Sequence, residues 1–184
     1  TDAGQLADSA SGRDLYVPGQ TPVGGRSSST DYDAGAKFSR FGVGIDTVTE
    51  NNDKLGAFVE WDFFGGSLGN ENSTNTYGVT LRHAYAYWNK WTAGQTWSVF
   101  MDTAALPDAV DFIGPTDGVI FVRQAQVRYT TGNFMVALED PQTTVLPRGG
   151  GAAASSDRGA VPDLTARYNW KGKWGHFGVA ALLR

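Results

Sequence analysis

Regular alternation of apolar and other residues dominates the chain from residue 40 onward. From Phe41 to Ile45, every second residue is large and apolar, and the residues between are glycine. Because side chains of a strand point alternately to two faces, this pattern predicts β-strands with one apolar face. It predicts no helix of useful length and eight strands, over residues 40–46, 54–63, 79–87, 91–100, 124–129, 134–138, 164–170 and 177–183. For 91–100 the pattern does not indicate which parity faces which way.

The connections between these strands alternate between short and long. The short ones cover 49–53, 89–90, 131–133 and 171–174, and the long ones cover 65–75, 101–119 and 140–163. All seven prolines lie in the long connections or in the first 36 residues, where they interrupt no strand ladder. In an antiparallel meander, alternate connections lie at opposite ends. We therefore expect all short turns at one end, as in outer-membrane barrels with periplasmic turns and extracellular loops.

Aromatic residues sort by depth along the predicted strands. One group flanks the short turns and a second lies at the other end, a distribution typical of the two aromatic girdles of a membrane barrel. The first group is Trp88, Trp91, Tyr129, Phe134, Trp170 and Trp174, and the second is Trp61, Phe63, Trp97 and Phe100. The longest strongly apolar run, 179–183, is far shorter than the ~20 residues of a membrane helix. A soluble sandwich with one solvated face is the alternative.

Composition and motifs exclude several other functions. The net charge of -4 gives no basic surface for nucleic acid, and the absence of cysteine excludes disulfides and thiolate metal sites. The two histidines, His83 and His176, lie near no second metal ligand, so we expect no metal, no cofactor and no enzyme activity. A membrane lipase built on Ser98 and His83 is a remote alternative. Thr1 does not begin a signal peptide, so we expect that one was removed or that the chain is an internal piece.

Several stretches of sequence carry a more specific signal. They are SRFG at 39–42, LRHAY at 81–85, AGQTWSVFMD at 93–102, LPD at 106–108, DF at 111–112, GP at 114–115 and FVRQAQVRYT at 121–130, preceded by DLYVP at 14–18. Together they resemble the DcaP-like outer-membrane porins, a family of dicarboxylate-uptake channels, over nearly the whole chain. The resemblance implies an all-β, antiparallel, up-and-down transmembrane barrel of the 16-stranded porin type, assembled as a homotrimer, with loop three folded into the lumen.

The chain departs from a complete member of that family. It lacks a first strand and a terminal aromatic residue, so we expect an amino-terminal half, roughly strands two to nine, forming one porin domain over 1–184. In this interpretation 1–36 is extracellular loop one and 101–119 is the constriction loop. A closed eight-stranded barrel is the rival geometry, although its interior would be filled by side chains whereas the inward positions here are glycines and arginines.

The inward parities gather the residues expected to line the pore. These are Arg40, Arg82, Arg123, Arg128, Arg167, Gln124 and Gln126, with the constriction acids Glu60, Asp62, Asp102, Asp108 and Asp111 facing them. Guanidinium groups bind carboxylates without risk of deprotonation, so this set predicts passive diffusion of small anionic solutes such as dicarboxylates. The alternative is that acids and arginines neutralise one another as structural pairs that hold loop three to the barrel.

The function expected is thus that of a channel in the outer membrane of Gram-negative bacteria, in contact with its lipid and lipopolysaccharide. A structural or adhesive β-domain with partner-binding loops and no transport is the runner-up. The alternation in 79–87 assigns His83 and Tyr85 to the outward face, where they and 91–100 would form the subunit contact, with loop 65–75 reaching over a neighbour.

Overall fold

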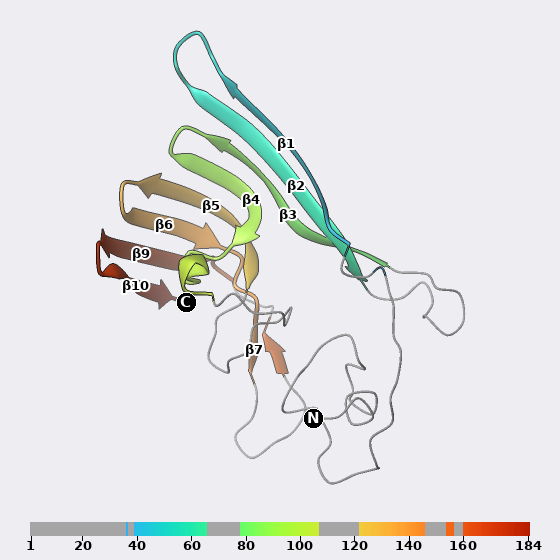
Figure 1. The fold of residues 1–184 in the computed structure, drawn as a ribbon. Coiled ribbons are helices and arrows are strands. Elements are labelled where there is room, and N and C mark those ends of the chain that lie inside the picture. The colour runs from blue at the N-terminus through green and yellow to red at the C-terminus, as the bar shows by residue number, and fades with distance from the viewer. Residues whose placement is uncertain (1–35, 37–38, 66–77, 107–121, 146–153, 157–159) are drawn as a thin grey trace. The chain divides into compact units, whose positions relative to one another are not determined.

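A computed structural model describes residues 36, 39–65, 78–106, 122–145, 154–156 and 160–184. Eight antiparallel strands form one sheet in the order β1-β2-β3-β4-β5-β6-β9-β10 (Figure 1). The strands are β1 (Phe41–Val48), β2 (Lys54–Gly65), β3 (Gly78–Trp88), β4 (Trp91–Trp97), β5 (Arg123–Thr131), β6 (Phe134–Glu139), β9 (Asp163–Gly172) and β10 (Gly175–Leu183). This confirms the all-β, up-and-down architecture and the eight strands expected from the alternation.

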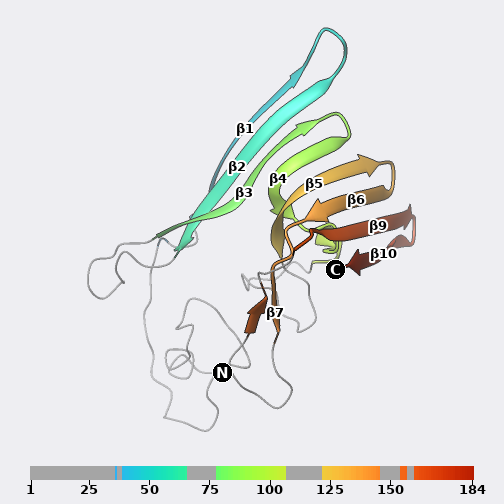
Figure 2. The same ribbon diagram turned by 180° about the vertical axis from the view of Figure 1, so that it is seen from behind.

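The four short turns lie together at one end of the sheet, as the turn lengths predict (Figures 1 and 2). Asn52 and Asn89 supply the left-handed backbone that these tight turns need, with φ of 63° and 53°. Neighbouring turns also bond to one another, because the Asn89 side chain donates to Asp53 and accepts from the Lys54 amide. The sheet therefore has a short-turned end that is fixed by local sequence.

The chain divides into two compact units. The sheet belongs to the unit formed by 37–103 and 120–184, whereas 1–36 and 104–119 form the other, which lies almost wholly outside the described residues. The expected loop one and most of the expected constriction loop, including Asp108 and Asp111, fall in that undescribed part.

Burial in the sheet is inverted relative to a water-soluble domain. Among the described residues, the buried apolar side chains are only Val99, Met101 and Ala137. The buried polar ones are Asp62, Arg82, His83, Thr96, Ser98, Gln124, Gln126, Glu139, Asp163, Thr165 and Arg167. Large apolar residues such as Val43, Ile45 and Val127 are instead more than half exposed. We call the side of the sheet that carries these buried polar residues the polar face, and the side that carries the exposed apolar residues the apolar face. The described part of the chain contains no apolar helix of membrane-spanning length.

A β-bulge corrects the facing of β3. The pairing of β2 with β3 shifts between Glu60 and Trp61, so that Glu60 pairs with His83 while Trp61 pairs with Leu81. The bulge places one extra residue, Arg82, on β3 and reverses the parity beyond it. His83 and Tyr85 therefore lie on the polar face, and the outward facing expected for them was wrong. They are consequently not part of a subunit contact on the apolar face.

Three further details differ from the expectation. β4 ends at Trp97 rather than at residue 100, and the chain then turns over the polar face. The long connection 140–163 contains a small hairpin of β7 (Thr143–Val145) and β8 (Ala154–Ser156). Finally, β1 and β10 each have one neighbour in the described sheet, so the eight strands do not close on themselves and the closed eight-stranded barrel is excluded.

Candidate functional site

The β3 bulge positions Arg82 in a dense ion-pair cluster on the polar face. Its Nε donates to Glu60 Oε1 at 2.7 Å and its Nη1 donates to Asp62 Oδ2 at 2.9 Å. Arg40 approaches the same Glu60 oxygen at 3.7 Å. Arg82 and Asp62 are 5% and 1% exposed, so within this cluster they form a buried ion pair whose opposite charges neutralise each other.

Arg123 and His83 lie beside this cluster. The Arg123 guanidinium carbon lies 4.1 Å from the centre of the Trp97 ring, a stacked cation–π arrangement. The His83 ring contacts Trp97 edge-on, and its Nδ1 is 3.1 Å from Thr96 Oγ1. The Trp97 ring thus packs against Arg123 at the start of β5, and His83 packs against the same ring.

Arg167 binds the segment that follows β4. From β9, its Nη2 donates to Asp102, its Nη1 to the Phe100 carbonyl at 3.4 Å and its Nε to Asn169 at 2.7 Å. His176 on β10 donates its Nε2 proton to the same Asp102 oxygen at 3.0 Å. Arg167 and Asp102 therefore form a direct pair across the polar face.

The two glutamines on β5 also make structural contacts. Gln126 donates its amide to the Thr96 and Trp97 carbonyls, at 3.2 Å and 2.9 Å, and Gln124 donates to the Gln142 carbonyl at 3.1 Å. Both side chains are buried on the polar face. They hold the ends of β4 and of the β6–β7 connection in place.

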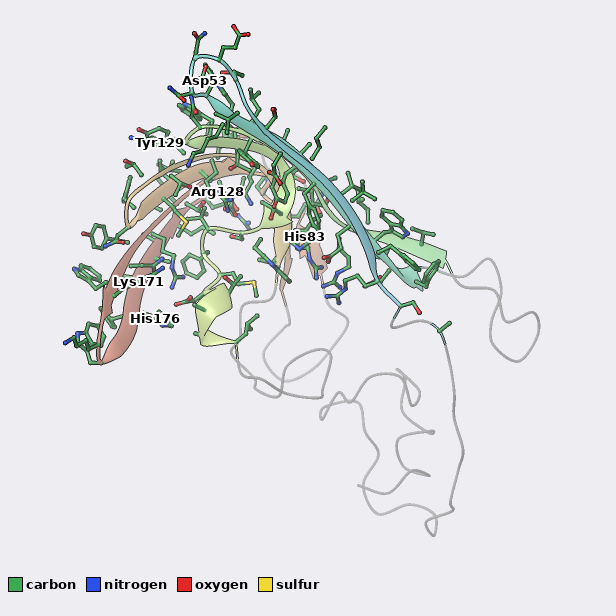
Figure 3. All side chains as sticks on the ribbon, turned by 45° about the horizontal axis from the view of Figure 1, so that its top comes forward. Asp53, His83, Arg128, Tyr129, Lys171 and His176 are labelled. Carbon is green, nitrogen blue, oxygen red and sulfur yellow. The ribbon has the colours of Figure 1, made fainter. Side chains whose placement is uncertain are left out.

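Arg128 differs from the other arginines on the polar face. It pairs in register with Thr92 and Ala137, and Figure 3 shows it with His83 on the concave side of the sheet. Its Nε is buried and has no hydrogen-bond partner within the described ranges, and no carboxylate there pairs with it. It lines a pocket of about 240 Å³ together with Thr96, Trp97, Ser98, Val99, Met101, Thr103 and Met135. The wall of this pocket thus contains one guanidinium group, from Arg128, and three hydroxyl-bearing residues, Thr96, Ser98 and Thr103.

Glu139 is the residue that sequence reasoning missed. It lies at the end of β6, is 2% exposed, and accepts hydrogen bonds from three donors. The alternation along β6 could have identified it, because Glu139 has the same parity as the inward-facing Met135 and Ala137. A buried carboxylate on that side of the strand needs hydrogen-bond donors from other parts of the chain.

Two alternative chemistries are not supported by this geometry. Ser98 Oγ donates to Glu139, whereas His83 bonds to Thr96, so Ser98 and His83 form no nucleophile–base pair. No three His, Asp or Glu side chains of the described ranges converge in a way that would hold a metal ion.

Comparison with known proteins decides the family. The sequence matches the DcaP outer membrane protein family over residues 16–179. The chain belongs to that family. The fold agrees, since the chain is similar to the crystal structure of the outer membrane channel DcaP of Acinetobacter baumannii, with 27% sequence identity and a TM-score of 0.62. The similarity covers 80% of this chain and 41% of that channel, and the comparison with curated proteins gave no match.

Membership of the DcaP family accounts for the inverted burial. The protein is located in the outer membrane as a β-barrel, where the apolar face contacts lipid and the polar face is turned away from it. The chain spans about two fifths of the length of the solved channel.

Proposed function

We propose that the protein is a channel for passive diffusion of small hydrophilic solutes, with a preference for anions such as dicarboxylates. The observation that carries this proposal is Arg128, a guanidinium on the polar face that lines a pocket and has no carboxylate partner among the described residues. Arginine cannot lose its charge in a protein, and its planar fork matches a carboxylate. Arg128 therefore retains its positive charge for a passing anion.

The paired arginines have a different role in this proposal. Arg82 and Arg167 are nearly buried and spend their hydrogen bonds on Glu60, Asp62 and Asp102. Their charges are largely cancelled locally, and they contribute to holding the polar face together. Arg40 precedes β1 and Arg123 begins β5, both at the end of the sheet away from the short turns, and in this proposal they are the further cations that attract a dicarboxylate.

The comparisons support a channel at the level of the family, and the dicarboxylate preference comes from the sequence resemblance. Selectivity requires that binding stays weak, because a tightly held solute would not leave the pore. A few cations beside a narrow polar passage satisfy this condition, since they raise the local anion concentration without enclosing the solute.

Single-channel recording in planar bilayers tests this proposal with the protein purified from outer membranes. We expect discrete conductance steps and a reversal potential of anion-selective sign in a salt gradient. Arg128→Ala shifts that potential toward cations, whereas Lys171→Ala, which removes the same charge from an exposed position on β9, leaves it unchanged. The absence of any conductance would favour a structural or adhesive domain, and equal shifts in both variants would remove Arg128 from the mechanism.

Assembly as a homotrimer stays a prediction. The contact surface must lie on the apolar face, which excludes His83 and Tyr85. Light scattering of the detergent-solubilised protein, corrected for bound detergent, is expected to give three copies; a monomeric mass would contradict it.

A further inference from the structure

The chain that follows β4 forms a distinct inner segment, residues 98–103, on the polar face. Its amide at Ser98 donates to the Val122 carbonyl, and its Met101 amide donates back to the Ser98 carbonyl, which closes a turn. Val99 and Met101 are 2% and 5% exposed and are two of the three buried apolar residues among those described. The inner segment is thus packed against the sheet rather than extended from it.

A buried carboxylate holds the start of the inner segment. Glu139 Oε2 accepts the Ser98 hydroxyl at 2.6 Å, and Oε1 accepts the Val99 amide at 2.7 Å and the Thr165 hydroxyl at 2.9 Å. A buried carboxylate is tolerated only when such donors replace water. Two of the three donors belong to the inner segment, so Glu139 is a clasp between that segment and β6.

A second clasp holds the other end of the segment. Asp102 accepts from Arg167 on β9 and from His176 on β10. The Arg167 guanidinium fits there because position 178 on β10 is glycine, where a Cβ would lie 2.2 Å from Arg167 Nη2. The two clasps therefore hold both ends of the six-residue segment, through residues of β6, β9 and β10.

We propose that Glu139 and Asp102 are positioning residues that fix the inner segment over Arg128 and thereby set the size of the passage beside it. Ser98, Val99, Met101 and Thr103 line the Arg128 pocket from the inner segment, and Thr96, Arg128 and Met135 line it from β4, β5 and β6. Release of either clasp lets the segment move away from the sheet and opens this pocket. The proposal rests on the proposed channel for its functional meaning, whereas the clasps themselves can be tested without transport.

Thiol labelling provides that test, because the sequence contains no cysteine. Met101→Cys introduces one thiol at a position that is 5% exposed. In isolated outer membranes, a charged methanethiosulfonate reagent is expected to label this thiol slowly. Adding Glu139→Ala raises the labelling rate by about tenfold or more, since a buried site reacts only through local opening. In place of Glu139→Ala, the variant Glu139→Gln keeps an oxygen that accepts from the Val99 amide, and we expect its labelling to be as slow as with Glu139.

Two further variants distinguish positioning from general damage. Asp163 is also a buried acid and is the register partner of Glu139, but it accepts hydrogen bonds from Arg184 and, within the described residues, makes none with the inner segment. Asp163→Asn is therefore the matched control, with an unchanged labelling rate. Gly178→Ala displaces the flexible end of Arg167 from Asp102, so we expect it to accelerate labelling of the Met101→Cys thiol. This variant tests the second clasp independently if Glu139→Ala does not fold, as judged by heat-modifiable gel mobility.

Fast labelling in Glu139→Ala or Gly178→Ala together with slow labelling in Asp163→Asn supports the proposal. Equal rates in wild type and in both clasp variants, or an equal acceleration by Asp163→Asn, would overturn it. Single-channel recordings of the same variants distinguish failure of the proposed function from failure of this inference. A wild-type protein that conducts no current overturns the proposed function. Clasp variants that conduct with unchanged current noise and conductance overturn the effect of the clasps on the passage.

Discussion

At the scale of single residues, the arginines of the polar face divide by their partners. Arg82 has carboxylates on two sides and Arg167 has Asp102, whereas Arg128 has none within the described chain. A sequence cannot show this division, since inward parity is the same for all three. Spacing predicted that Arg82, Arg128 and Arg167 face inward, but pairing depends on contacts between strands and on the inner segment.

Loss of Arg82 is expected to destabilise the fold. Arg82→Ala removes the cation from Asp62, which is 1% exposed, and breaking a buried pair in this way costs about 3–5 kcal/mol. Arg40→Ala removes a more exposed cation at 3.7 Å and costs about 0–1 kcal/mol. Urea titration of the protein refolded in lipid vesicles measures both values; an Arg82→Ala cost no larger than that of Arg40→Ala would show that the cluster is not structural.

At the scale of elements, the eight strands and their turns were predictable because they depend on local patterns. Period-two alternation gave the strands, and turn length gave the common end of 49–53, 89–90, 131–133 and 171–174. The bulge at Arg82 was not predictable, because an inserted residue leaves an uninterrupted alternation in the sequence of β3 and becomes visible only against β2. The inner segment was missed for a related reason: residues 98–100 continue a strand-like run, and the contacts that hold them over the polar face come from Val122, Glu139 and Arg167, which are distant in the sequence.

The corrected facing of β3 can be measured by thiol labelling. Tyr85→Cys lies on the polar face and Ala84→Cys on the apolar face. In outer membranes we expect a water-soluble maleimide to modify the first thiol and not the second, since reagent in water does not reach a thiol in hydrocarbon. The reverse pattern would restore the uninterrupted alternation and remove the bulge.

Gly94 is a second feature of an element that sequence did not indicate. Its φ is +124°, and a Cβ there would lie 2.3 Å from the Ala84 carbonyl oxygen in β3. Gly94→Ala is therefore expected to cost on the order of 3 kcal/mol or more, because both backbone strain and overlap with a paired strand oppose it. Gly132, in an open turn with nothing within 4 Å of its Cβ position, is the control: Gly132→Asn costs about 1 kcal/mol or less. Comparable urea midpoints for the two variants would contradict this account.

At the scale of the whole molecule, inverted burial determines the environment. A water-soluble sandwich buries its apolar face, whereas here Val43, Ile45 and Val127 are exposed and acids, arginines and glutamines are buried. The sequence predicted this inversion only in part, since alternation alone is shared by soluble and membrane sheets. Glycine-rich inward positions, aromatic girdles and the resemblance to the DcaP family indicated a membrane barrel rather than a soluble sheet.

A charge on the apolar face distinguishes the two environments. Val127 is 51% exposed and lies within β5, so Val127→Lys in a soluble protein would change stability by about 0.5 kcal/mol or less. Facing lipid, the same change costs about 2–4 kcal/mol near the bilayer midplane. Unfolding free energies in lipid vesicles provide the measurement, and a neutral Val127→Lys would argue that this face does not contact hydrocarbon.

Solute flux into liposomes is the most direct test of an anion-preferring channel, because it compares solutes that differ in charge but hardly in size. The protein purified from outer membranes is reconstituted, and the permeation rate of a four-carbon dicarboxylate is divided by that of a four-carbon neutral diol. We expect a ratio above one at low salt that falls toward one as salt screens Arg128 and the other cations of the polar face, and a smaller ratio for Arg128→Ala. A wild-type ratio at or below one under low salt, or no permeation of either solute, would contradict it.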